Sequence, residues 1–199
     1  MTTTRGLDLV PRLITVDDAI RMTEAGILAE GERVELVDGL LVEMSPEGPA
    51  HRWLALELTT FLARTYPDPY RVGSQSTLHL DELNLREPDV SVVSATSPDR
   101  WSVSDEIPLL IEISDTSLRR DLGPKALDHA RFGIPAYWVI DLQGRRLVAH
   151  SQPSPDGYGV VRAHGERETV RLPRTGVDIE VARLLLPPAT GQRTPPPGP

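Results

Sequence analysis

The sequence predicts an α+β protein in which a mixed central β-sheet is flanked by two main helices. Three observations predict this fold class. Two long segments repeat apolar residues at helical spacing, several short apolar runs have the length of strands, and no internal repeat is present. The predicted order of elements is helix, hairpin, helix, strands, helix and strands.

The N-terminal part begins with a helix and a hairpin. Thr15-Val16-Asp17-Asp18 resembles a capping box, so a short helix should follow and end near Gly26. Asp38-Gly39 lies between two apolar runs, at residues 34–37 and 40–44, and this arrangement is a strong hairpin signal. Residues 45–49 form a loop of Ser, Pro, Glu, Gly and Pro.

The remaining elements alternate between strands and helices. A helix is expected over residues 51–66, where Pro67-Asp68-Pro69 ends it. A second is expected over 116–132, broken or kinked early by Gly123-Pro124 and ended by Gly133 as a C-cap. Strands are expected at 70–80, 89–94, 109–114, 136–141 and 146–151, the last two as a hairpin, with 158–163 and 168–172 as extensions of the sheet.

The chain has room for one domain with a sizeable core, since it is 199 residues long. We expect residues 12–185 to form that domain. Residues 1–11 are expected to be a flexible N-terminus. Residues 186–199 form a Pro-rich tail that cannot pack and is expected to be disordered.

Composition excludes several classes of function. The chain has no cysteine, and therefore no disulfide, thiolate nucleophile or Cys-based zinc site. Its five histidines lack the spacing of zinc hydrolases, and it has neither a Gly-rich phosphate loop nor a G-x-S-x-G motif. It has no signal-peptide core and no apolar run of about 20 residues. We expect a cytoplasmic protein without membrane contact.

The net charge of −8 argues against broad, non-specific binding of nucleic acid, which depends on a basic surface. It still permits a single basic cleft. The segment 112–146 is near neutral although the whole chain is acidic, so positive charge is relatively concentrated there.

Two carboxylates are candidates for a metal site. Glu112 interrupts an apolar strand, where a carboxylate is costly unless it binds a metal or forms a buried salt bridge with an arginine. Asp89 opens the preceding strand, although an Asp after Pro88 is also common at the end of a loop. Neighbouring strands lie about 4.8 Å apart, so both carboxylates can reach one Mg²⁺ ion.

Lys125 lies downstream of both acids and is the only lysine among the 21 cationic residues. A lysine offers a compact ammonium group that an arginine cannot replace. The alternative is that Lys125 is a solvated residue on a helix, as most lysines are.

The order of these residues resembles that of a known group of nucleases. Pro88-Asp89, Glu112-Ile113-Ser114 and Asp121-x-x-x-Lys125 resemble the PD-(D/E)XK nuclease superfamily. Within it, the chain is similar to the Uma family of putative restriction endonucleases over roughly residues 12 to 185. Each motif is weak alone, but their joint order is specific. The further matching segments are residues 34–39, Met44-Ser45-Pro46, His51 and residues 133–141.

The resemblance implies a restriction-endonuclease-like fold and Mg²⁺-dependent cleavage of DNA, with Mn²⁺ as an alternative metal and a homodimer as the assembly. Asp89 and Glu112 would then hold the metal, with the Ile113 carbonyl as a third ligand. Lys125 would orient or deprotonate the attacking water and offset charge on the phosphate.

One position departs from the superfamily's pattern. The usual lysine lies two residues after the acid, and that place is Ser114 here. Catalysis therefore requires Lys125 to reach back into the site. The main alternative is a catalytically inactive binding or scaffold protein on the same fold, which the acidic net charge favours. A two-carboxylate glycosidase would leave Lys125 without a role.

Three further residues are candidates for the site. Glu35 is either an additional acid at the metal or an exposed strand residue. His51 either contacts phosphate or a metal-bound water, or it is a surface residue at a helix start. Asp121 lies four residues before Lys125 and is expected to pair with it.

Overall fold

The computed structural model describes residues 10–29, 31–44, 47–94 and 107–185. The chain divides into two compact units, each of which contains two stretches of sequence. Unit 1 is Met1–Pro46 with Thr77–Glu87, and unit 2 is Glu47–Ser76 with Pro88–Pro199. The predicted flexible start, up to residue 9, and the predicted tail at 186–199 lie outside the described residues. That residues 12–185 fold as one domain stays a prediction.

Unit 1 contains a capped helix and a four-stranded sheet of order β2-β1-β5-β4. The capping box at Thr15 is confirmed, because its hydroxyl accepts from Asp18 N at 3.1 Å while the Asp18 carboxylate accepts from Thr15 N at 3.2 Å. The hairpin is confirmed too, with Asp38 at φ 48° and Gly39 at φ 76°. The elements are α1 (Val16–Glu24), β1 (Val34–Val37), β2 (Leu40–Glu43), β4 (Leu78–Asp81) and β5 (Asn84–Arg86).

The single strand expected over residues 70–80 is wrong. Two strands occupy it, β3 (Tyr70–Ser74) in unit 2 and β4 in unit 1. Between them Gln75 takes a left-handed conformation, with φ 50°, and this turns the chain out of the first strand. The short strand β5 was not predicted, because three residues are too few to establish a period.

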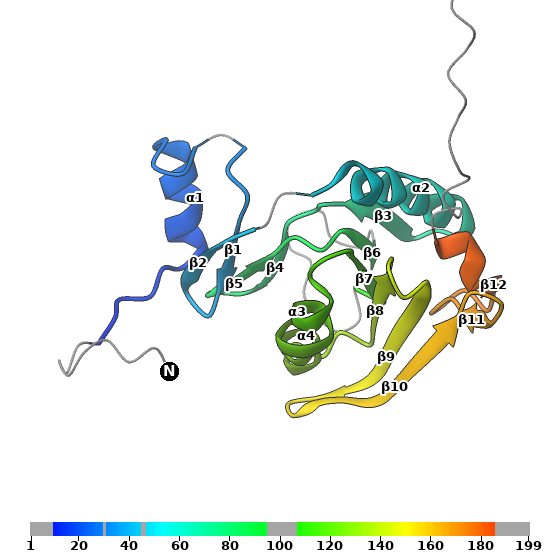
Figure 1. Cartoon of the computed structure of the whole chain (residues 1–199). Coiled ribbons are helices and arrows are strands. Elements are labelled where there is room, and N and C mark those ends of the chain that lie inside the picture. The colour runs from blue at the N-terminus through cyan, green and yellow to red at the C-terminus, as the bar shows by residue number, and fades with distance from the viewer. Residues whose placement is uncertain (1–9, 30, 45–46, 95–106, 186–199) are drawn as a thin grey trace, which may run out of the picture. The chain divides into compact units, whose positions relative to one another are not determined.

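Unit 2 is built on a six-stranded mixed sheet of order β10-β9-β8-β7-β6-β3. Strands β7 and β8 are parallel, and the other neighbours are antiparallel. The predicted α+β class with a mixed sheet flanked by helices is therefore confirmed (Figure 1). The elements are α2 (Pro49–Thr65), β6 (Val90–Ser94), β7 (Leu109–Ser114), β8 (Ala136–Asp141), β9 (Arg146–Ser154) and β10 (Gly157–Gly165).

The main core lies between α2 and one face of this sheet. Leu54, Leu58 and Leu62 recur on one side of α2, and each is at most 2% exposed. They belong to one cluster with Ile111 and Ile113 of β7. Because side chains alternate along a strand, the residue between those two isoleucines, Glu112, points to the opposite face.

The helical segment after β7 is continuous. It runs as α3 (Leu118–Arg120), a π-helical turn (Asp121–Lys125) and α4 (Ala126–Arg131). A break or kink was expected at Gly123-Pro124, and the chain forms this widened turn there instead of a break. Pro124 has no N–H for the regular hydrogen bond of an α-helix. Gly133 has φ 73° and ends the segment as predicted.

The C-terminal strands do not extend the large sheet. Strand β11 (Thr169–Arg171) pairs with β12 (Asp178–Glu180) in a separate two-stranded sheet, followed by a 3₁₀ helix (Val181–Leu184). The extension expected at residues 168–172 is therefore wrong, whereas β10 does extend the sheet. Among the described helices, none is both long and apolar enough to cross a membrane.

Candidate functional site

The two predicted metal-binding acids come from neighbouring strands: Asp89 directly precedes β6, and Glu112 lies within β7. Strands β6 and β7 pair with Val90 opposite Ile111, and continuing this antiparallel register by one residue brings Asp89 opposite Glu112. Directly opposed residues have Cβ atoms about 5 Å apart. Asp89 is 5% exposed and Glu112 4%. Two residues that are 23 positions apart in the sequence thus lie in one buried region.

The Asp89 carboxylate is held in a fixed orientation. Its Oδ2 accepts a hydrogen bond from the backbone N–H of Ile113 at 2.6 Å and lies 2.9 Å from Nε2 of His51. The structure gives Oδ1 no hydrogen-bond partner among the described residues. One oxygen therefore anchors the side chain, and the other remains available to a ligand.

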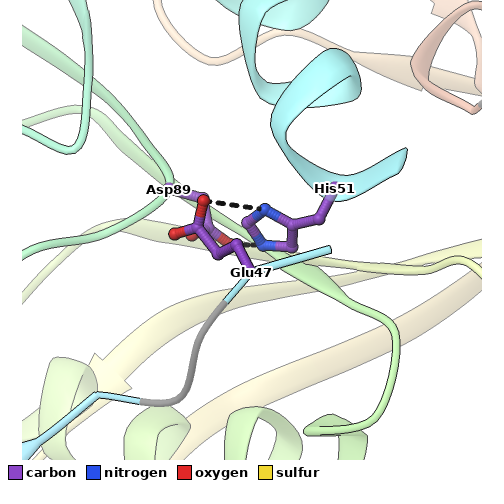
Figure 2. A group of neighbouring side chains, drawn as sticks. All are labelled: Glu47, His51 and Asp89. Atoms are coloured by element: carbon purple, nitrogen blue, oxygen red, sulfur yellow. Dashed lines mark hydrogen bonds and ion pairs between the residues drawn. The ribbon is translucent and has the colours of Figure 1, made fainter. Parts of the chain in front are cut away.

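His51 lies in the first turn of α2, and it is buried. The alternative of a surface histidine at a helix start is therefore wrong. Its Nδ1 lies 3.4 Å from Oε2 of Glu47, so the ring stands between two carboxylates (Figure 2). Donor atoms of Glu47, His51 and Asp89 all lie within 4.8 Å of one another.

Glu47 is the residue that the sequence analysis missed. The sequence predicts only a loop at this position. The one available signal was its position four residues before His51 at the start of a helix. This spacing is a signal only within a helix, and Glu47 precedes the N-cap Gly48 of α2, so the sequence pattern does not place it beside His51.

Lys125 lies at the end of the π-helical turn, and its Nζ is 2.9 Å from Oε1 of Glu112. The Lys125 side chain is 12% exposed and that of Glu112 6%. The lysine is thus not a solvated helix residue. Glu112 forms a buried ion pair, as one alternative held, but its partner is this lysine and not an arginine.

The electrostatics of Glu112 are dominated by burial. Removal from water raises the pKa of Glu112 well above its usual range, and the nearby charges of Asp89 and Asp121 raise it further. Lys125 acts in the opposite direction through its charge and its hydrogen bond. Buried carboxylates that repel each other in this way are stabilised by a bound cation.

Asp121 and Ser114 form a second layer next to this site. Asp121 does not pair with Lys125 as expected. Its Oδ2 accepts a short hydrogen bond from Ser117, and its Oδ1 lies 3.8 Å from Arg120 Nε. Ser114 is 1% exposed, and its hydroxyl lies 3.4 Å from that of Ser117. These contacts tie the end of β7 to the helical segment that carries Lys125.

Two other candidates, Glu35 and Ile113, have known contacts in the structure but no established role in the site. Glu35 lies in unit 1, where its Oε1 accepts a hydrogen bond from the backbone N–H of Glu87 at 3.2 Å. Its role in the site stays a prediction. Ile113 supplies the N–H that binds Asp89, and its side chain is in the core. The predicted use of its carbonyl as a metal ligand also stays a prediction.

The donor set fits a hard divalent cation. Two carboxylates and one imidazole converge at Glu47, His51 and Asp89, and a third carboxylate lies opposite Asp89 on β7. Carboxylate oxygens suit Mg²⁺ and Mn²⁺, and an imidazole is compatible with transition metals. Without a cation, a protonated His51 ring can bridge the same two carboxylates as an ion pair.

Comparisons with known proteins identify a family and a similar fold. Residues 17–183 match a family profile, Uma2, with the description "Putative restriction endonuclease". A crystal structure of a putative nuclease belonging to DUF820 from Anabaena variabilis is similar in fold, with a TM-score of 0.67 and 14% sequence identity. The similarity covers 86% of this chain and 97% of that one. No curated protein matches the chain in sequence.

Proposed function

We propose that this chain, which belongs to the Uma2 family of putative restriction endonucleases, is a divalent-metal-dependent nuclease that hydrolyses phosphodiester bonds in DNA. The observation that carries the proposal is the placement of Asp89. This one carboxylate lies beside Glu47 and His51 on one side and opposite Glu112, the partner of Lys125, on the other. An acidic cation site next to a buried ammonium group suits the chemistry of phosphate esters.

Three side chains would hold the metal: Glu47, His51 and Asp89. Glu112 and the Ile113 carbonyl are further candidate ligands. The structure gives the second oxygen of Glu112, Oε2, no partner among the described residues. A bound Mg²⁺ or Mn²⁺ would polarise the phosphate and lower the pKa of a bound water.

Lys125 would act on the phosphate directly. Its ammonium group is held by Glu112 and lies in a largely buried setting, where charge interactions are stronger than in water. In this position it can donate a hydrogen bond to a phosphate oxygen and offset the negative charge that develops during hydrolysis. Ile113 N–H and His51 orient Asp89, so the acid does not have to reorganise.

A catalytically inactive nuclease-fold binding or scaffold protein is the second candidate. Ser114 favours it, because this residue occupies the place of the superfamily's usual lysine and is buried against Ser117. The net charge of −8 favours it as well. A scaffold has no need of a metal site, and therefore metal binding separates the two candidates.

The first experiment is a cleavage assay on plasmid, linear and single-stranded DNA with Mg²⁺ or Mn²⁺. We expect Asp89→Asn and Lys125→Ala each to lower the rate by about a hundredfold or more, the usual effect of losing one group that stabilises a transition state. Asp115→Asn is the matched control, because it makes the same change at an exposed acid three residues after Glu112. Cleavage that survives both changes at the site would contradict the proposal.

Calorimetric titration with Mn²⁺ then separates the ligands. We expect Glu47→Gln and Asp89→Asn to weaken binding of the ion, and Lys125→Ala to leave binding in place. A Glu112→Gln variant decides whether that carboxylate is also a ligand. A wild-type protein that binds no Mn²⁺ and cuts no DNA would favour the scaffold.

The expected assembly follows from the resemblance, and the expected location follows from the sequence. A homodimer remains our expectation, because two active sites would cut both strands of a duplex, and light scattering in solution tests it. Residence in the cytoplasm likewise remains a prediction.

A further inference from the structure

A pocket of about 450 Å³ opens on the sheet face that is opposite to the candidate nuclease site. Trp138 of β8 lines this pocket, whereas its neighbour Val139 is the residue that pairs with Glu112. Because successive side chains in a strand point to opposite faces, the pocket and Glu112 are separated by the sheet. The volume lies within the range of roughly 300–1,000 Å³ that is usual for small-molecule sites.

Short side chains on neighbouring strands create the pocket. Ala149 of β9 pairs with Trp138 on one side and with Arg162 of β10 on the other. In the next row, Ser151 pairs with Ala136 of β8. Ala136, Ala149 and Ser151 all line the pocket, and their small size leaves space between larger neighbours.

The pocket is positively charged although the chain is acidic. Its lining contains Arg162, His164 and Arg171, and the described residues that line it include no Asp or Glu. The charge of Arg171 is balanced by two contacts to Asp178, at 2.8 and 2.9 Å. Arg162, in contrast, is exposed and makes no hydrogen bond or ion pair with a described residue. The uncompensated charge at the pocket is therefore that of Arg162.

We infer that this pocket binds a phosphate group, with Arg162 as its principal contact. A planar guanidinium group binds phosphate through two parallel hydrogen bonds. Two further lining residues, Ser151 and Thr169, carry hydroxyl groups that can donate to the remaining oxygens. The ligand is a phosphate monoester of a small molecule or a phosphodiester of a nucleic-acid strand. This site does not depend on the proposed nuclease activity.

The test is calorimetry on the full-length protein in EDTA, with inorganic phosphate, AMP and the dinucleotide TpT as probes. We expect saturable binding of phosphate that Arg162→Ala weakens by about tenfold or more, because the variant loses the charge-assisted hydrogen bonds to phosphate. Arg167→Ala is the matched control, because Arg167 is an exposed arginine outside the pocket lining. It should change the affinity by less than about twofold.

The loss of binding in Arg162→Ala also separates this site from the candidate nuclease site. Glu112 and its partner Lys125 lie on the other face of the sheet. Tighter binding of AMP would assign the site to small phosphate monoesters, and tighter binding of TpT would assign it to nucleic acid. The inference is overturned if the wild type shows no saturable binding, or if Arg162→Ala binds as the wild type does while retaining its melting temperature.

Discussion

Asp18 in α1 and Glu112 in β7 each bind one cationic side chain, at 2.6 Å from Arg21 and at 2.9 Å from Lys125. The two contacts are similar in length, but the pKa values of the two acids are shifted in opposite directions. The hydrogen bond from Arg21 is the main cause that lowers the pKa of Asp18 to about 2. Burial raises the pKa of Glu112 well above its usual range, and Lys125 offsets this only in part.

The difference lies in the surroundings of each pair and not in its geometry. Arg21 is 66% exposed, so its pair with Asp18 remains solvated and contributes little to folding. Lys125 and Glu112 are largely buried. If one partner is removed, water cannot stabilise the charge that remains on the other. The exposed ion pair in unit 1 thus contributes little to stability, whereas in unit 2 the loss of either partner should be strongly destabilising.

The largest effect on stability should follow Lys125→Met, which keeps most of the side chain but removes its charge. Glu112 would be left buried without its cation, and we expect a loss of about 3 kcal/mol in the free energy of unfolding, measured with urea. Adding Glu112→Gln should recover most of this loss without restoring DNA cleavage. A Lys125→Met variant as stable as the wild type would show that the pair is open in solution.

Removal of the helix cap should have a smaller effect. Thr15→Ala eliminates the hydroxyl that accepts from Asp18 N, and we expect a loss of about 1 kcal/mol in the same measurement. Thr15→Ser retains the hydroxyl and should be close to the wild type. If alanine and serine behave alike, the capping box does not stabilise α1.

The smallest effect concerns the exposed pair itself. An NMR titration should find the pKa of Asp18 at about 2, below its ordinary 3.8, and Arg21→Ala should raise it. Since the folded-state pKa is lowered, the stability from ionised Asp18 is present above about 3.8 and is lost as the pH falls toward 2. An unchanged pKa in Arg21→Ala would make the backbone of Thr15 the main partner.

The sequence by itself determined the features that depend on neighbouring residues. The capping box at Thr15 and the Asp38-Gly39 hairpin were predicted because their signals span a few positions. The buried strand at Leu109–Ser114 was also predicted, as was the unusual acid within it. Resemblance to a known family added the expected roles of Asp89, Glu112 and Lys125 and the expectation of a restriction-endonuclease-like fold.

Only the tertiary structure decided which groups meet. The register of β6 against β7 sets Asp89 opposite Glu112, and the π-helical turn carries Lys125 back to the strand. Neither the register nor the widened turn has a short sequence signal, because both depend on packing across the sheet. For the same reason the sequence did not reveal Glu47, which lies in a loop without a periodic pattern. It did not reveal the uncompensated charge of Arg162 either, because the neighbours of Arg162 come from β9 and β11 as well as from its own strand.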